Sequence, residues 1–205
     1  MEQKQAILSK INRSKKGSIF LPNSFYPIDT RYASNVLAEL SNDGKLIRVA
    51  FGIYVKPKMS SLGAILPTMQ DIVRAIAQRD AAQILPTGAT AENYLGFSQQ
   101  VPMNTVYLTS GTSRKIQIGK RTLTLKHSAP STFAYRGKTM PILVLALKSI
   151  GRSNVNEDTL AVVYGVLKQH PEEDTWRDDI MLAPRWIRSI ITTIKEKISQ
   201  NEQMD

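Results

Sequence analysis

The 205-residue chain contains no cysteine and only two histidines, His127 and His170. Without thiols the chain can form neither a disulfide nor a thiolate zinc site, so zinc-finger modes of DNA binding are excluded. Neither histidine has a Ser, Cys or carboxylate pattern nearby that would suggest a catalytic triad. We therefore expect both histidines to be structural, and we assign no catalytic residue.

A long hydrophobic segment and a glycine-rich phosphate loop are also absent. The longest apolar run, Ile142 to Leu147, is far too short to cross a membrane, and residues 1–14 lack the apolar core of a signal peptide. There is no Walker-type or dinucleotide-binding glycine motif. These absences predict a cytoplasmic protein with no cofactor and no membrane partner.

A single acidic run contains residue types that can bind a metal ion. It follows Pro171 and consists of Glu172, Glu173, Asp174, Asp178 and Asp179. Such a run is more often a solvated surface than a set of metal ligands. The Gly17-Ser18 pair is not followed by the Asp-x-Asp pattern of a nucleotidyltransferase. We expect no metal and no enzyme, and a nuclease or a nucleotidyltransferase is the alternative.

Positive charge is in excess, and it is unevenly distributed. The net charge is +10. Residues 1–58 contain ten Lys/Arg and four Asp/Glu, residues 59–128 contain seven and three, and residues 129–205 contain ten of each. The excess therefore lies in the first two thirds of the chain. This distribution suits an N-terminal part that binds a polyanion, although a solvated basic surface would give the same count.

Residues 29–56 predict a capped amphipathic helix followed by a basic hairpin. Asp29 and Thr30 can cap the start of the helix, and Gly44 can end it because glycine adopts the left-handed conformation without steric cost. One helical face is apolar and should be buried: it comprises Ala33, Val36, Leu37 and Leu40. Residues 45–49 and 53–56 then read as two strands joined by a turn at residues 50–52.

The opposite helical face carries side chains that can read bases in a major groove. Arg31 can donate twice to guanine, Asn35 can pair with adenine, and Ser34 can contact either. Alone, this face is an ordinary solvated one, but a basic two-stranded ribbon directly after it favours DNA binding. The predicted DNA contacts, including lysines that would bind phosphates, are Lys15, Lys16, Thr30, Arg31, Ser34, Asn35, Lys45, Arg48 and Lys56, with Lys58 as a further phosphate candidate.

A second basic cluster lies in a predicted sheet. Its members are Arg114, Lys115, Lys120, Arg121 and Lys126. We interpret this cluster as the polar face of a half-exposed sheet, with an additional DNA surface or an RNA contact as the alternative.

The whole pattern predicts an α+β protein with an N-terminal winged helix-turn-helix over residues 1–58. Residues 57–69 read as a linker, and residues 68–205 as a mixed domain with a small antiparallel sheet and C-terminal helices. In that domain the predicted helices are 68–81, 91–97, 139–150, 156–170 and 184–199, the predicted strands are 105–110, 115–118 and 121–126, and residues 84–88 are a loop.

Three motifs carry a family resemblance. They are Val36-Leu37-Ala38-Glu39-Leu40, Asp43-Gly44-Lys45-Leu46-Ile47-Arg48 and Phe51-Gly52-Ile53-Tyr54-Val55. In this pattern the segment from Gly17 to Pro57 resembles the N-terminal winged helix of AbiEi-like antitoxins from type IV toxin–antitoxin (abortive infection) systems. A weaker likeness continues from Ala89 to Lys126, and residues 131–205 match only in being helical.

The resemblance implies a prokaryotic antitoxin that represses its own operon by binding promoter repeats in double-stranded DNA. It also implies a co-encoded nucleotidyltransferase toxin that the second part of the chain counteracts, and by analogy a homodimer. One feature departs from the family, because Ala50-Phe51 occupy the wing tip where a basic residue is common. The alternatives are an antitoxin that neutralises its toxin by direct binding and a stand-alone winged-helix regulator.

Overall fold

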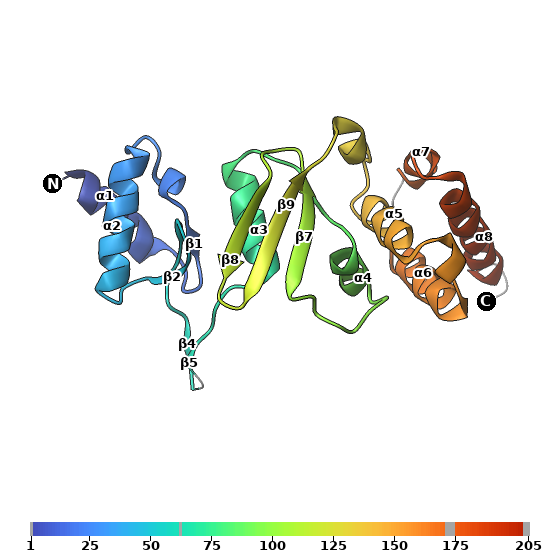
Figure 1. The fold of residues 1–205 in the computed structure, drawn as a ribbon, viewed down its shortest axis with the longest axis horizontal. Coiled ribbons are helices and arrows are strands. Elements are labelled where there is room, and N and C mark those ends of the chain that lie inside the picture. The colour runs from blue at the N-terminus through green and yellow to red at the C-terminus, as the bar shows by residue number, and fades with distance from the viewer. Residues whose placement is uncertain (1, 62, 171–174, 203–205) are drawn as a thin grey trace. The chain divides into compact units, whose positions relative to one another are not determined.

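The computed structural model describes residues 2–61, 63–170 and 175–202 (Figure 1). Over these residues the chain is an α+β protein with eight α-helices and small antiparallel sheets, which confirms the predicted class. It divides into two compact units, Met1–Ala82 with Lys115–Leu123 and Gln83–Arg114 with Thr124–Asp205. The predicted division into residues 1–58 and 68–205 stays a prediction. No helix among the described residues is both long enough and apolar enough to span a membrane.

The first unit begins with two helices and a three-stranded sheet. Its elements are α1 (Glu2–Arg13), β1 (Ile19–Phe20), the 3₁₀ helix η1 (Pro22–Phe25), α2 (Thr30–Asn42), β2 (Ile47–Ala50) and β3 (Ile53–Val55). The strand order is β1-β3-β2, and both pairings are antiparallel. The short strand β3 therefore lies in the middle of the sheet and links both of its edges.

The predicted apolar face of α2 is the centre of this part of the core. Ala33 and Leu37 have no measurable exposure, and Val36 and Leu40 are nearly as deeply buried. The Val and Leu side chains of this face each contribute roughly 1.5–3 kcal/mol when they leave water. The surrounding cluster comprises Ile7 and Ile11 of α1 together with Phe20, Phe25, Leu46 and Tyr54.

Both ends of α2 follow the sequence prediction. The Asp29 carboxylate Oδ1 accepts a hydrogen bond from the Tyr32 amide at 2.9 Å, which satisfies a free donor of the first turn. After the helix, Gly44 has φ +72°, a conformation that other residues adopt only with strain. This turn lets the Lys45 and Leu46 amides bond back to the Leu40 carbonyl at 2.9 and 3.1 Å.

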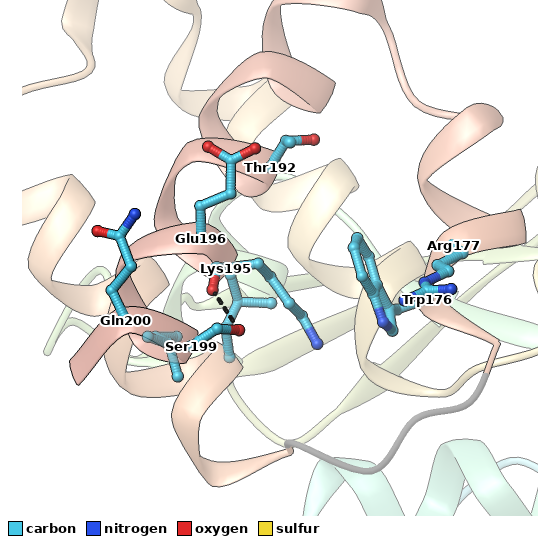
Figure 2. Close-up of a pocket in the computed structure, with 9 residues that line it drawn as sticks. Trp176, Arg177, Thr192, Lys195, Glu196, Ser199 and Gln200 are labelled. Atoms are coloured by element: carbon cyan, nitrogen blue, oxygen red, sulfur yellow. Dashed lines mark hydrogen bonds between the residues drawn. The ribbon is translucent and has the colours of Figure 1, made fainter. Parts of the chain in front are cut away.

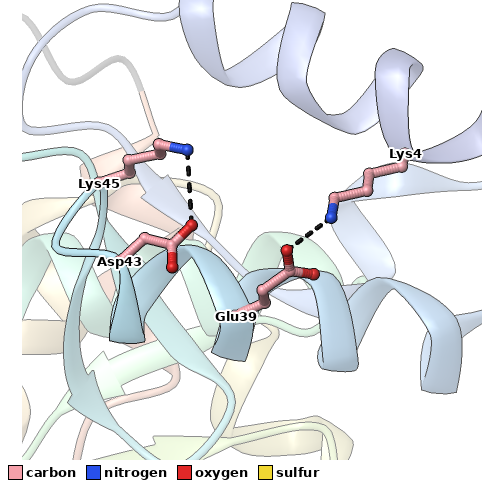
Figure 3. Close-up of polar contacts among 4 residues, drawn as sticks. All are labelled: Lys4, Glu39, Asp43 and Lys45. Atoms are coloured by element: carbon pink, nitrogen blue, oxygen red, sulfur yellow. Dashed lines mark hydrogen bonds and ion pairs between the residues drawn. The ribbon is translucent and has the colours of Figure 1, made fainter.

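Two exposed ion pairs accompany α2 (Figure 3). Lys4 of α1 donates to Glu39 of α2 at 2.5 Å, and this hydrogen bond raises the pKa of Lys4. Lys45 and Asp43 are a looser pair at 3.4 Å. Surface pairs of this kind contribute little to stability, so apolar burial and not ion pairing holds α1 against α2.

Lys56 occupies a different place from the one predicted. Its Nζ donates to the main-chain carbonyls of Ile11, Asn12 and Ser14 at 2.9, 2.9 and 2.8 Å, at the C-terminal end of α1. An ammonium group has three donors, and these carbonyls use all of them. Lys56 thus caps α1, where the helix dipole also favours a cation. The phosphate contact at Lys56 stays a prediction, and making it would require the loss of at least one of these hydrogen bonds.

Residues 57–69, predicted as a linker, contain a small hairpin of β4 (Met59–Ser60) and β5 (Gly63–Ala64). The predicted helix follows as α3 (Met69–Arg79), whose start is closed by reciprocal bonds between Thr68 and Asp71. The hydrogen bond from the Thr68 hydroxyl lowers the pKa of Asp71. This cap is therefore complete at neutral pH, and its contribution is lost in acid as the pH falls through the lowered pKa.

A four-stranded sheet has the order β6-β7-β9-β8. Its strands are β6 (Ile84–Pro86), β7 (Asn104–Thr109), β8 (Arg114–Ile118) and β9 (Arg121–His127). The predicted two-residue turn between β8 and β9 is present, with Gly119 at φ +58°. The predicted loop at residues 84–88 was wrong in its first half, because Ile84, Leu85 and Pro86 pair with Thr109, Leu108 and Tyr107.

The C-terminal part of the second unit is helical. Its helices are α5 (Thr139–Ile150), α6 (Glu157–Gln169), α7 (Trp176–Met181) and α8 (Arg185–Glu202), with 3₁₀ turns η2 (Pro130–Phe133) and η3 (Arg152–Asn154). The short helix α4 (Ala89–Leu95) lies earlier in the chain, between β6 and β7. The core of α5, α6 and α8 includes Leu143, Leu147, Val163, Ile187 and Ile191. Helix α7 was not predicted from the sequence, because its six residues are too few to show a helical period.

The Lys56 cap generates a stability prediction. Lys56→Met keeps the length of the side chain but removes three charge-assisted hydrogen bonds, so we expect a loss of about 1–3 kcal/mol. The readout is faster hydrogen exchange of the α1 amides, together with a lower urea midpoint. Lys58→Met is the matched control, since Lys58 is exposed. Equal exchange rates in the two variants would contradict the capping role.

Candidate nucleic-acid interface

The outer face of α2 lies open, as its periodicity predicts. Thr30, Arg31 and Asn35 are exposed, and Ser34 is half-buried. All four residues border one surface depression of about 610 Å³. Arg31, Ser34 and Asn35, called the reading face below, are therefore brought together with the start of their helix on a concave surface.

Three other elements contribute to the depression. Its further lining residues are Pro22 and Asn23 of η1, Asp29, Phe51 and Gly52 of the β2–β3 turn, and Arg79 at the end of α3. The Arg79 guanidinium forks to Asp80, with Nε–Oδ1 at 2.7 Å and Nη2–Oδ2 at 3.2 Å. Sequence reasoning missed Asn23 and Arg79, because nothing in the local pattern relates either residue to α2.

The β2–β3 hairpin, called the wing below, turns at Phe51-Gly52. Gly52 has φ +69°, and the register shifts between Arg48 and Ala50, which marks a bulge. The Arg48 guanidinium carbon lies 5.2 Å from the centroid of the Phe51 ring, within cation–π range. The Phe51 side chain is 89% exposed. The wing tip is thus an aromatic ring with an arginine held against it.

The predicted phosphate contacts lie outside the depression. Lys15 and Lys16 are exposed in the turn after α1, and Lys45 is exposed beyond the end of α2. Arg48 is exposed on β2, next to Phe51. These side chains can reach a polyanion, whereas Lys56 is committed to α1 as described above.

The second basic cluster is mixed in its exposure. Lys115, Lys120 and Lys126 are exposed, while Arg114 and Arg121 are half-buried. Along β8 the exposed Lys115 and Gln117 alternate with partly buried neighbours, the pattern of a sheet with one wet face. This arrangement agrees with the interpretation of the cluster as a polar sheet face.

A hollow of about 470 Å³ lies among α6, α7 and α8 (Figure 2). Lys195 Nζ stands 4.7 Å from the Trp176 ring centroid, and Arg177 lies 5.8 Å from the same ring. The Ser199 hydroxyl donates to the Lys195 carbonyl of its own helix at 3.1 Å. Lys195, Arg177 and Ser199 therefore each interact with a neighbouring group.

Among the described residues, the contacts of His127 are local. His127 Nδ1 lies 2.9 Å from the Gly111 carbonyl, and its main-chain amide donates to the Ser113 hydroxyl at 2.8 Å. His170 is exposed. The described residues contain no group of three or more His, Asp or Glu that could hold a metal ion.

The acidic run is not uniformly solvated. Glu172, Glu173 and Asp174 lie outside the described residues, and Asp178 is exposed beside Arg136. Asp179, in contrast, is only 1% exposed, and its two oxygens accept from the Arg136 and Gly137 amides at 2.8 and 2.7 Å. The expectation of a solvated carboxylate was wrong here, because Asp179 anchors the loop before α5.

The Asp179 carboxylate also affects its surroundings. Burial, and secondarily the charge of Asp179, raises the pKa of Tyr135 in the neighbouring loop. The raised pKa means that the Tyr135 phenol stays neutral to a higher pH than an exposed tyrosine would.

These features define an α+β protein whose first unit presents a concave, polar helix face beside a short β-hairpin. The chain belongs to the DUF6088 family, a family of unknown function whose model matches residues 6–175. No curated protein sequence matches the chain. The matched range contains the reading face, the wing and the four-stranded sheet.

The anchoring role of Asp179 is testable by an isosteric change. Asp179→Asn replaces one acceptor oxygen with an NH₂ group that faces a main-chain amide, so we expect a loss of about 2–4 kcal/mol in unfolding free energy. Urea denaturation followed by Trp176 and Trp186 fluorescence measures the change. Asp178→Asn, at an exposed position on the same helix, should shift the midpoint little. The structural role would be contradicted if Asp179→Asn lost a metal-dependent activity while its unfolding free energy stayed the same as that of the wild type.

Proposed function

We propose that the N-terminal part of the protein is a winged helix-turn-helix that binds double-stranded DNA in a sequence-dependent way. The observation that carries the proposal is the shared depression, in which the reading face of α2, the start of that helix and the wing tip lie on one concave surface. Arg31, Ser34 and Asn35 have the donor and acceptor chemistry that discriminates base edges in a major groove.

The order of the elements supports the proposal. A helix, a strand, a short helical turn, a second helix and a hairpin follow one another, and the three strands form a single sheet. We interpret this order as that of a winged helix, in which α2 would be the recognition helix and η1 would replace the middle helix. In this arrangement the burial of one face of α2 leaves the other available to DNA.

The charge distribution supports a polyanionic partner. Exposed basic residues both precede and follow the reading face along the chain: Lys15, Lys16, Lys45 and Arg48. The excess of positive charge is confined to the first two thirds of the sequence. Phosphate contacts of this kind provide affinity and fix the position of the protein on the duplex, while base contacts provide specificity.

The biological role that we propose is that of an antitoxin which represses its own promoter and counteracts a nucleotidyltransferase toxin. The resemblance of residues 17–57 to AbiEi-like antitoxins supports this role. The second unit, with its sheet and helices, would then act on the toxin. An antitoxin that neutralises by direct binding differs in one measurable respect: its complex with the toxin would survive high salt, whereas phosphate-driven DNA binding weakens steeply.

The central test is selection of duplexes from a random library by the full-length protein, followed by anisotropy titrations on the selected site. Arg31→Ala and Asn35→Ala should each cost about 1–3 kcal/mol at the base pairs that they contact and relax the preference there. Asn42→Ala is the matched control: Asn42 is exposed on the same helix but lies outside the depression. Binding of the selected site no tighter than random duplex would refute sequence-specific recognition.

A phosphate contact should behave differently from a base contact. Lys45→Ala is expected to weaken binding to specific and random duplexes about equally and to reduce the slope of log K against log[salt] by about 1. Lys148→Ala, an exposed lysine of the second unit, serves as the control and should leave the slope unchanged. A Lys45→Ala variant with altered base preference and an unchanged salt slope would assign Lys45 to base reading instead.

A further inference from the structure

The Phe51 ring at the wing tip is exposed to water, so the fold gains no stability from burying it. Phe51 is 89% exposed, and among the large apolar side chains of the described residues only Tyr26 is equally exposed. Burying a phenylalanine contributes roughly 1.5–3 kcal/mol, which this position forgoes. A single exposed apolar residue needs no explanation by itself, but Phe51 is exposed at a particular place, beside the reading face.

Phe51 lies on the rim of the depression that contains the reading face. The same concave surface is lined by Arg31, Ser34 and Asn35 from α2 and by Phe51 and Gly52 from the wing. A duplex that places a major groove on α2 has its adjacent minor groove beyond the bordering phosphate backbone. In such a complex the hairpin turn beside α2 would face that backbone and groove, with the exposed Phe51 ring at its tip.

The local backbone holds the ring outward. A bulge between Arg48 and Ala50 interrupts the register of the hairpin, and bulges re-aim the side chains that follow them. Gly52, with φ +69°, allows the tight return into β3. The next strand is fully buried at Ile53, Tyr54 and Val55, so the base of the turn is fixed by the core.

Arg48 completes the tip. Its guanidinium carbon stands 5.2 Å from the Phe51 centroid, and the side chain is otherwise exposed. A guanidinium stacked on a ring keeps its N–H donors at the edge, where phosphate oxygens can accept from them. The tip thus combines an exposed apolar ring with a guanidinium group.

We propose that Phe51 is an apolar wedge that enters the minor groove beside the bases read by α2 and partly unstacks one base step. Minor-groove proteins use phenylalanine and other apolar side chains in this way. Pyrimidine–purine steps such as TA and CA/TG unstack at the lowest cost, so the protein selects such a step without a hydrogen bond to its bases. The inference rests on the proposed DNA binding and specifies how the wing contributes to it.

The experiment uses the full-length protein and the duplex that it selects from a random library. 2-Aminopurine is substituted at successive flanking positions, and its fluorescence, which rises on unstacking, is recorded with and without protein. We expect a rise at one pyrimidine–purine step with the wild type and none with Phe51→Ala. We also expect Phe51→Ala to bind about tenfold more weakly, with the base preferences of α2 retained.

Three further variants sharpen the result. Phe51→Trp should retain the fluorescence rise, whereas Phe51→Lys should abolish it while steepening the salt dependence, because the contact becomes electrostatic. Tyr94→Ala removes an exposed aromatic ring from α4 and should change neither readout. Circular dichroism confirms that each variant is folded.

The outcomes separate the wedge from the proposed function. Specific binding by the wild type without any fluorescence rise, or with the same rise in Phe51→Ala, overturns the wedge and leaves DNA reading by α2 intact. Failure of the wild type to select any duplex overturns both. A loss of self-association in Phe51→Ala at unchanged DNA affinity per protomer would assign the ring to a contact with a second copy and would also overturn the wedge.

Discussion

The one-sided apolar face of α2 is the constraint on which the proposed interface depends. Ala33, Val36, Leu37 and Leu40 are all buried, and a helix can bury only one such stripe against a single small core. The opposite side chains must then face outward, whatever they are. The direction of Arg31, Ser34 and Asn35 is thus a consequence of packing, and their chemistry can change without changing the fold.

Packing also fixes the wing relative to α2. Strand β3 lies between β1 and β2, and its Tyr54 belongs to the same apolar cluster as Leu37. Lys56, the first residue after β3, bonds to the end of α1 through its side chain and to Ser18 and Gly17 through its main chain. Because one short strand joins the sheet, the core and α1, movement of the wing base would disturb all three.

Sequence patterns predicted the elements whose information is local. The cap at Asp29, the four-residue apolar stripe and the turn at Gly44 define α2 without reference to the rest of the chain, and Gly119 similarly defines the β8–β9 turn. Elements that depend on distant partners were missed. Strand β6 is three residues long and is recognisable only by its pairing with β7, and α7 is stabilised by burial of Asp179 and Ile180. The role of Lys56 was missed for the same reason, since its carbonyl partners lie 42–45 residues earlier.

The candidate site shows the same division. Helical periodicity alone places Arg31, Ser34 and Asn35 together, but only the three-dimensional structure adds Asn23, Phe51 and Arg79 to their surface. It also changes the meaning of the wing tip. Judged by charge, Ala50-Phe51 argues against a DNA contact, because the expected basic residue is missing. The Arg48 guanidinium, however, extends from β2 over the Phe51 ring. The tip therefore does carry a positive charge. In such a tip the guanidinium can attract phosphates, an interaction that carries no sequence information. The ring can respond to how easily the DNA deforms, a property that depends on the base sequence.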